Sequence, residues 1–216
     1  MSIREERKRQ SHQAIIDAAL RLCTTGRSFN SITLREISRE VGLVPSAFYR
    51  HFADTNALGL EIIDKVSIHF KSILHQLGQA YLYQDNPDTE KSFELFFSAV
   101  EQHQEEWIFL ISERWGGSDF LRQAIAREVE YLIEDLTIHL KRIPSTAHIK
   151  DENELKTLAD LLINLAFHWA ITWINNIHRY PPPHLEAQQI LLKQQANMQL
   201  KMMFDGFSNW KDEKLS

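Results

Sequence analysis

The sequence is poor in cysteine, glycine and proline. A single cysteine, Cys23, among 216 residues excludes an internal disulfide framework and suits a reducing compartment. Only seven glycines and six prolines interrupt the chain, and three of those prolines are adjacent at 181–183. Such sparse interruption leaves long unbroken segments, which favours helices over many short strands. With 44% hydrophobic residues, the chain can fill one or two packed cores.

Signals for secretion and for catalysis are also missing. The first residues are rich in Arg and Lys and hold no apolar run of the secretory kind, so we expect a soluble, cytoplasmic protein. The ten histidines form no H-E-x-x-H motif, and neither C-x-x-C nor G-x-S-x-G occurs. His69 and His75 are six residues apart, and His103 shows no ligand partner at helical spacing. We therefore expect no enzyme, no catalytic residue, no metal site and no cofactor.

Charge is distributed unevenly along the chain. Residues 1–52 hold nine Lys and Arg against five Asp and Glu, a balance of +4. The remaining residues hold fifteen against twenty-four, a balance of −9. A basic end on an acidic body indicates that the first part meets a polyanion such as nucleic acid.

Apolar residues at three- and four-residue intervals predict an all-α protein of about nine helices. The expected helices cover about 4–25, 33–41, 45–52, 54–83, 89–103, 104–116, 118–142, 152–179 and 184–212. The first three are short or joined by tight connections and form one compact head. No strand alternation or internal repeat appears there.

The helix expected at 152–179 is apolar on nearly every side. It contains Asp160, Asn164 and His168, and its apolar run falls short of the roughly 20 residues that cross a bilayer. Because a carboxylate inside a membrane is costly, we expect no membrane span. Burial on two sides explains the composition better, with one side against the parent domain and the other against a second subunit. The helix at 184–212 also has a broad apolar face, so two helices from each chain would form a four-helix homodimer interface.

A helix-turn-helix follows the first helix. Thr33 and Glu36 have the T-x-x-E spacing of a capping box, Gly42 ends that helix, and Pro45 suits the first turn of the next. On a helical wheel of residues 45–52, Phe48 and Phe52 face inward. The opposite side carries small residues at its start and hydrogen-bonding residues at its end, namely Ser46, Ala47, Tyr49, Arg50 and His51.

That exposed side suits a helix lying in the major groove of DNA, because small residues let the backbone approach the bases. An ordinary helical corner is the alternative, but a merely solvated face is usually rich in Glu and Lys, and this one has neither. Four cations gather at the start of the first helix, where they oppose the helix dipole and would attract an external anion: Arg4, Arg7, Lys8 and Arg9.

The stretch TLREISREVGLVPSAFYRHFADTNAL resembles the helix-turn-helix of the tetracycline-repressor (TetR) family, over about residues 8–65. The resemblance implies an all-helical homodimer with a three-helix DNA-binding head, here residues 1–53. A helical domain for ligand binding and dimerisation would follow, here residues 54–216. The family acts as transcriptional repressors on palindromic double-stranded DNA operators.

By position in that family, Arg35 would hydrogen-bond guanine, and Ser46 and Ala47 would lie against base edges. Tyr49 and His51 would contact the DNA backbone, and Thr33 would cap its helix and touch phosphate. Pro45 and Arg50 complete the expected DNA-binding set. Many members carry a lysine where this chain has Asp54-Thr55, so the four cations of the first helix should supply more of the nonspecific affinity.

Two stretches, residues 27–60 and 109–136, are similar to the branch of TetR regulators that represses unsaturated fatty acid synthesis or acyl desaturase genes. The resemblance implies a long-chain acyl-CoA or related thioester as the small-molecule effector. Aromatic residues and two arginines are candidates for its site, although aromatic stripes also form plain cores: Phe93, Phe96, Phe97, Trp107, Phe109, Arg114, Trp115, Phe120 and Phe167, with Arg122 as a second phosphate partner.

Two alternatives stay open at this point. One is a TetR-type regulator of an efflux or catabolic operon that responds to another hydrophobic molecule. The other is a helical adaptor that uses its basic end to bind a protein.

Overall fold

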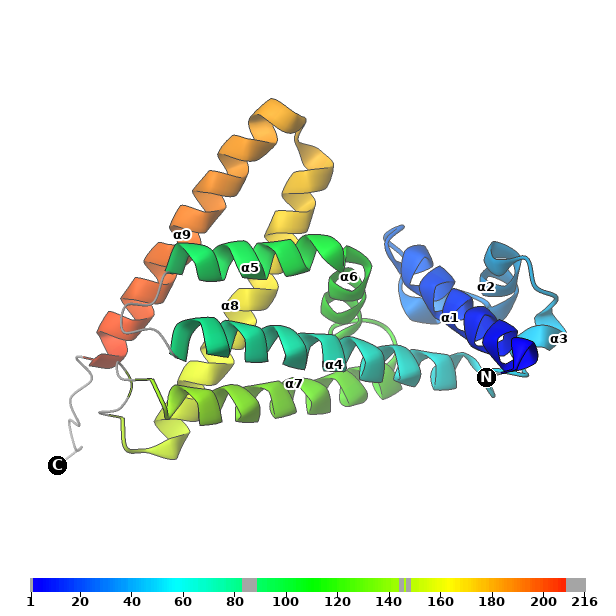
Figure 1. Ribbon diagram of the computed structural model, residues 1–216, viewed down its shortest axis with the longest axis horizontal. Coiled ribbons are helices and arrows are strands. Elements are labelled where there is room, and N and C mark those ends of the chain that lie inside the picture. Colours follow the sequence, from blue (N-terminus) through cyan, green and yellow to red (C-terminus); the bar gives the residue numbers. More distant parts are fainter. Residues whose placement is uncertain (1, 83–88, 144–145, 147–148, 209–216) are drawn as a thin grey trace. The chain divides into compact units, whose positions relative to one another are not determined.

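The computed structural model describes residues 2–82, 89–143, 146 and 149–208, and these contain helices and no strand (Figure 1). The all-α prediction is confirmed. The helices are α1 (Ile3–Cys23), the 3-10 helix η1 (Phe29–Ser31), α2 (Leu34–Val41), α3 (Pro45–Phe48), α4 (Thr55–Leu82), α5 (Thr89–Gln102), α6 (Gln104–Glu113), α7 (Asp119–Leu140), α8 (Glu152–Arg179) and α9 (Pro182–Ser208). The predicted break between the helices at 54–83 and 89–103 lies outside the described residues.

Contacts divide the chain into two compact units. The first comprises Met1–Phe70 and His103–Val129, and the second comprises Lys71–Gln102 and Glu130–Ser216. The first unit therefore contains more than the predicted head, because α6 and the first part of α7 belong to it. The functional boundary after residue 53 stays a prediction.

The head is built on a buried stripe of α1 and on the inner side of α2 and α3. Ile15, Ala19 and Cys23 are buried along α1 at four-residue intervals, and Ile37 of α2 is fully buried. Phe48 and Phe52 also face inward, with 0% and 4% of their surfaces exposed. The apolar spacing thus correctly identified the side of each helix that forms the core.

The start and end of α2 are encoded locally. The predicted capping box is present: the Glu36 backbone N–H donates to Thr33 Oγ1 at 3.2 Å, and the Thr33 N–H donates to Glu36 Oε2 at 2.8 Å. Gly42 ends the helix in the left-handed region, with φ of 73°. A second capping box, Ser2 with Glu5, starts α1 and was not predicted.

The helix after Gly42 is shorter than predicted. The α-helix covers only Pro45–Phe48, and the chain then forms a tighter turn in which the His51 N–H donates to the Phe48 carbonyl at 2.8 Å. Hydrogen bonds to the third preceding residue tighten this turn. Phe52 nevertheless faces inward as the wheel predicted, and its N–H donates to the Phe48 carbonyl at 3.1 Å.

The 3-10 helix η1 is one of the elements that hold the rest of the first unit to the head. The backbone N–H of Phe29 in η1 donates to Glu113 Oε1 in α6 at 2.8 Å, and both residues are buried. A Cβ on Gly59 of α4 would lie 2.8 Å from Leu121 of α7 and 3.0 Å from Phe29. Gly59 thus lets η1, α4 and α7 approach closely.

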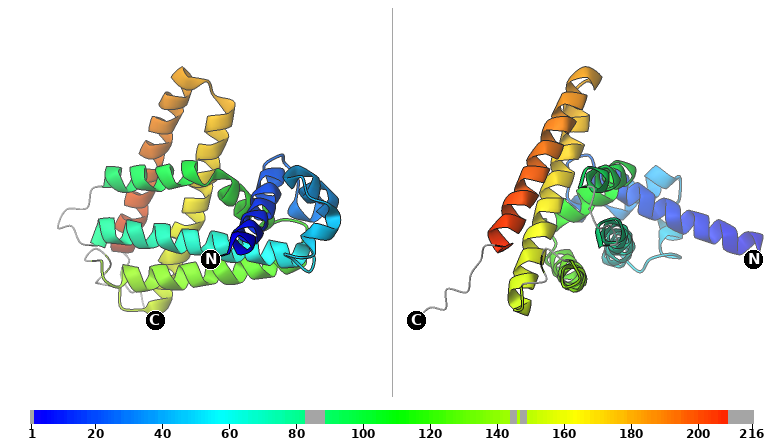
Figure 2. Two further views of the ribbon diagram at one scale, coloured as in Figure 1. Left: turned by 45° about the vertical axis from the view of Figure 1, so that its right-hand side comes forward. Right: turned by 60° about the vertical axis from the view of Figure 1, so that its left-hand side comes forward.

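The second unit is organised around α8. Figure 2 shows α8 and α9 running side by side in opposite directions, and Trp169 Nε1 of α8 donates to Gln199 Oε1 of α9 at 2.7 Å. Phe97 of α5 stacks on Trp173 of α8, with ring centroids 4.1 Å apart. Within the described residues, α8 is long and apolar enough to span a membrane by length and composition, and 44% of its most apolar window is buried inside the fold.

Candidate DNA-binding surface and ligand domain

An open hollow of about 480 Å³ lies between the start of α2 and the helix α3. It is lined by Thr33, Leu34 and Arg35 of the α2 start, and by Pro45 and Tyr49 of α3 and the turn after it. Four of these five residues belong to the predicted DNA-binding set. The fold therefore brings together residues separated by up to sixteen positions, on one face of the head.

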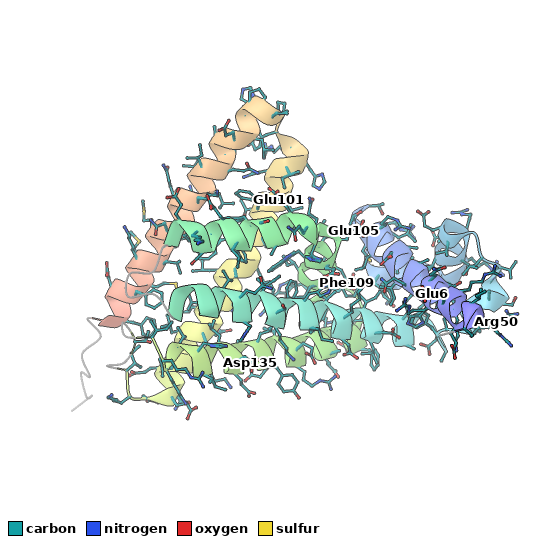
Figure 3. The ribbon with its side chains drawn as sticks, in the orientation of Figure 1. Glu6, Arg50, Glu101, Glu105, Phe109 and Asp135 are labelled. Atoms are coloured by element: carbon teal, nitrogen blue, oxygen red, sulfur yellow. The ribbon has the colours of Figure 1, made fainter. Side chains whose placement is uncertain are left out.

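The outer side of α3 agrees with the predicted contact surface. Ser46 and Arg50 are exposed, Ala47 is half-buried, and Tyr49 has 63% of its surface exposed. Arg50 lies at the outer edge of the first unit (Figure 3). Because Phe48 is fully buried between them, the short helix is fixed to the head while its neighbours stay accessible.

Thr33 is held by its own capping box. Its hydroxyl donates to Glu36 Oε2 at 2.8 Å, and Arg27 Nη1 lies 2.8 Å from Glu36 Oε1. Hydrogen bonds from Arg27 first, and then from Thr33, lower the pKa of Glu36 to about 2. The Glu36 carboxylate is thus ionised at neutral pH and fixes the first turn of α2, next to Arg35.

His51 differs from the other residues of the set. Its side chain is half-buried, and its Nδ1 atom is buried without a hydrogen-bond partner. Burial, and then the nearby charges of His12, Lys8 and Arg50, lower its pKa. At neutral pH His51 is therefore an uncharged hydrogen-bonding group.

The four predicted cations of α1 are exposed, and one of them lies near His51. Arg4, Arg7, Lys8 and Arg9 are all exposed, and Lys8 is close enough to His51 to act on its pKa. Arg9 pairs with Glu6 at 2.9 Å, so part of its charge is neutralised within the helix. Asp54, at the position where the TetR resemblance implies a lysine, caps α4 by accepting the Ala57 N–H at 2.8 Å.

Two family models match this chain. Residues 15–62 match the model described as "Bacterial regulatory proteins, tetR family". Residues 87–198, more than half of the chain, match the model described as "Tetracyclin repressor-like, C-terminal domain". The chain belongs to the TetR family. It is a DNA-binding transcriptional regulator and not an enzyme.

Solved TetR-type structures share the fold at low sequence identity. FadR of Bacillus subtilis, in complex with stearoyl-CoA, is 15% identical with a TM-score of 0.62, and the match covers 90% of this chain and 98% of that one. FadR of Thermus thermophilus, in complex with lauroyl-CoA, is 17% identical with a TM-score of 0.55, covering 90% and 94%. NalD of Pseudomonas aeruginosa, a repressor of the MexAB-OprM multidrug efflux pump, is 19% identical with a TM-score of 0.59, covering 93% and 97%.

The aromatic residues predicted for the effector site of this TetR protein fall in both units. In the first unit, Trp107 and Phe109 of α6 are buried, and Trp107 packs on Phe70 of α4 with ring centroids 4.2 Å apart. Phe109 packs edge-on against Phe29, at 5.8 Å. These two residues therefore connect α6 to the core of its own unit.

In the second unit, the aromatic residues predicted in α5 and α8 are all buried: Phe93, Phe96, Phe97 and Phe167. Trp169 and Trp173 were not among the predicted residues, yet Phe93 packs edge-on against Trp169 at 5.7 Å. Trp173 Nε1 donates to Glu101 Oε1 at 2.9 Å. Both tryptophans lie within the apolar run of α8, and this position could have predicted from the sequence that they are buried beside the α5 aromatic residues.

Four predicted residues lie near the junction of α6 and α7 instead. Trp115 and Phe120 have 80% and 48% of their surfaces exposed, unlike the other predicted aromatic residues, and their assignment to the effector site stays a prediction. Trp115 lies in the connection after α6, which ends at Glu113, and Phe120 lies in the first turn of α7. Arg114 lies 5.5 Å from the centre of the Trp115 ring, and Arg122 pairs with Asp119 and the Gly116 carbonyl.

Proposed function

We propose that this TetR regulator is a repressor that binds a palindromic operator as a homodimer and responds to a long-chain acyl-CoA or related thioester. The observation that carries the DNA-binding part is the hollow at the α2 start, where Thr33, Arg35, Pro45 and Tyr49 converge. An exposed guanidinium there can read guanine, and the tyrosine hydroxyl can hold a phosphate. Such a regulator works in the cytoplasm, where its operator is.

The two C-terminal helices support the homodimer. Within the described parts of α8 and α9, five large apolar side chains are 44–67% exposed: Leu161, Ile190, Leu191, Met198 and Met202. A second copy of the same helix pair would cover them and form a four-helix interface. Two recognition surfaces about one DNA turn apart, roughly 34–36 Å, would then meet the two halves of a palindrome.

The acyl effector is supported by two observations of different kind. The second unit has an aromatic and aliphatic interior of the type that binds apolar chains, formed by α5 and α8. The sequence stretches at 27–60 and 109–136 resemble repressors of unsaturated fatty acid synthesis. A ligand that binds the two arrangements of the dimer with different affinities would shift the population between them and change the spacing of the heads.

Regulation of an efflux or catabolic operon is the second candidate. It is favoured by the similar fold of NalD, a repressor of a multidrug efflux pump. An apolar interior serves a hydrophobic drug as well as an acyl chain. The two candidates differ in the ligand and the neighbouring genes, but share the operator-binding head.

Copurified ligand separates the two candidates. Mass spectrometry of denatured, freshly purified protein should release a long-chain acyl species. Stearoyl-CoA and oleoyl-CoA should then change the affinity of the protein for its operator in fluorescence anisotropy, whereas free coenzyme A should not. Recovery of a polyaromatic compound, with no response to acyl-CoA, would favour the efflux candidate.

The dimer has its own test. Size-exclusion chromatography with light scattering should give twice the chain mass of 25.3 kDa. Met198→Glu should shift the protein toward one chain mass, because it places a charge in the proposed interface. Tyr49→Ala should abolish operator binding and leave the dimer intact. A wild-type protein of one chain mass would contradict the homodimer.

A further inference from the structure

Three potential metal ligands converge in the first unit, outside the DNA-binding surface. His69 belongs to α4, His103 directly precedes α6, and Glu106 lies in the first turn of α6. One ligand atom from each lies within 4.8 Å of the other two. The sequence expectation that His103 lacks a partner at helical spacing is wrong, because Glu106 follows three residues later.

The distances between donor atoms are close to those of a bound ion. His69 Nδ1 lies 2.7 Å from Glu106 Oε2, and His103 Nδ1 lies 3.6 Å from the same oxygen. Ligands of a tetrahedral Zn²⁺ ion, with bonds of about 2.0–2.1 Å, are about 3.3 Å apart. Small rotations of the two imidazoles therefore suffice to place all three donors around one ion.

The burial of the Glu106 carboxylate distinguishes this cluster from an ion pair on the protein surface. The Glu106 side chain is only 9% exposed, whereas those of His69 and His103 are 37% and 36% exposed. The carboxylate thus lies at the base, with the two imidazoles at the solvent side.

We propose that His69, His103 and Glu106 bind a divalent transition-metal ion, of which Zn²⁺ fits best. Two imidazole nitrogens and one carboxylate oxygen form a donor set that suits Zn²⁺, whereas Mg²⁺ and Ca²⁺ require oxygen donors. Three protein ligands leave a fourth position for water or for a donor atom of a small molecule.

The ion would join α4 to α6. The far end of α6 carries Glu113, whose carboxylate accepts the Phe29 N–H of η1 at 2.8 Å. The metal site and this contact to the head are thus at opposite ends of one ten-residue helix. Metal binding would fix the position of α6 within the first unit.

Metal titration of the full-length protein tests the proposal. After removal of metals with a chelator, isothermal titration should show one Zn²⁺ bound per chain, and Mg²⁺ should not compete. Co²⁺ in place of Zn²⁺ should give the visible absorption of a tetrahedral complex. At a free Zn²⁺ concentration of 100 Kd, Tm should rise by about 5–10 °C.

Two ligand variants and a control decide whether the three side chains hold the ion. Glu106→Gln and His103→Ala should each weaken Zn²⁺ binding by at least about 100-fold. His184→Ala, an exposed histidine at the start of α9, should leave it unchanged. Equal affinity in the wild type and both ligand variants, or no saturable binding in the wild type, would overturn the site. These measurements use neither DNA nor acyl-CoA, so they are independent of the proposed function.

Discussion

Lys8 of α1 offers a quantitative test of how this regulator attracts DNA. The side chain is exposed, and its charge acts on His51 beside the recognition surface. In a homodimer, Lys8→Ala removes two cations. Each phosphate contact contributes about 0.9 to the slope of log K, where K is the DNA association constant, against log salt concentration. If each of the two lysines contacts one phosphate, the slope of the variant is therefore shallower by about 1.8. A fourfold increase in salt would then weaken the wild type by about tenfold more than the variant.

Fluorescence anisotropy with a labelled duplex, measured over a salt series, gives this slope. Because phosphate contacts carry no base preference, the loss should be the same on operator and on unrelated DNA. Arg35→Ala should behave differently, costing about 1–3 kcal/mol per half-site on the operator and relaxing its specificity. Arg142→Ala, an exposed arginine after α7, is the matched control. An unchanged slope for Lys8→Ala would refute the role assigned to the first helix.

Three further predictions concern stability and reactivity. Phe48→Ala removes a fully buried ring and should lower the free energy of unfolding by about 3–5 kcal/mol in urea titrations, whereas Phe120→Ala, at a half-exposed position, should change it little. The pKa of Glu36 is about 2 in the folded protein, against an ordinary value of 4.5. The ionised carboxylate therefore stabilises the fold above pH 4.5, and this contribution is lost as pH falls toward 2. Acid titration followed by circular dichroism should therefore be less steep for Glu36→Gln in that window, and an identical curve would contradict the assignment. Burial, and then the Glu113 carboxylate, raise the pKa of Cys23 to about 12, so the folded protein should not react with a thiol reagent at pH 8 but should react in denaturant. Above pH 9 the Cys23 thiol of the unfolded chain loses a proton that the folded chain keeps, so the free energy of unfolding should decline as pH rises above 9.

Much of the head could be predicted because its signals are local. The Thr33–Glu36 capping box, the stop at Gly42 and the inward side of Phe48 each depend on residues within one or two helical turns. The tight turn after Phe48 was not predictable from periodicity, since a wheel assumes that the α-helix continues. Helix ends were otherwise predicted to within a few residues, as expected for long amphipathic segments.

The aromatic residues around α6 and the cluster of His69, His103 and Glu106 were harder to predict because they depend on tertiary contacts. Aromatic composition alone did not distinguish buried Phe109 from exposed Trp115, which lie six residues apart on either side of the end of α6. His69 is 34 positions from His103, so only the packing of α4 against α6 shows that they share a carboxylate. The charge asymmetry of residues 1–52, in contrast, required no structure to indicate a polyanion.

Selection from random double-stranded DNA tests the central claim most directly, namely that the surface around Arg35 and Tyr49 reads operator DNA in two symmetric copies. The wild type should enrich a palindrome whose half-site centres are about one helical turn apart, roughly 34–36 Å. Arg35→Ala should lose one symmetric pair of base preferences and keep the spacing. Enrichment of no sequence, or of a single unrepeated half-site, would contradict the account.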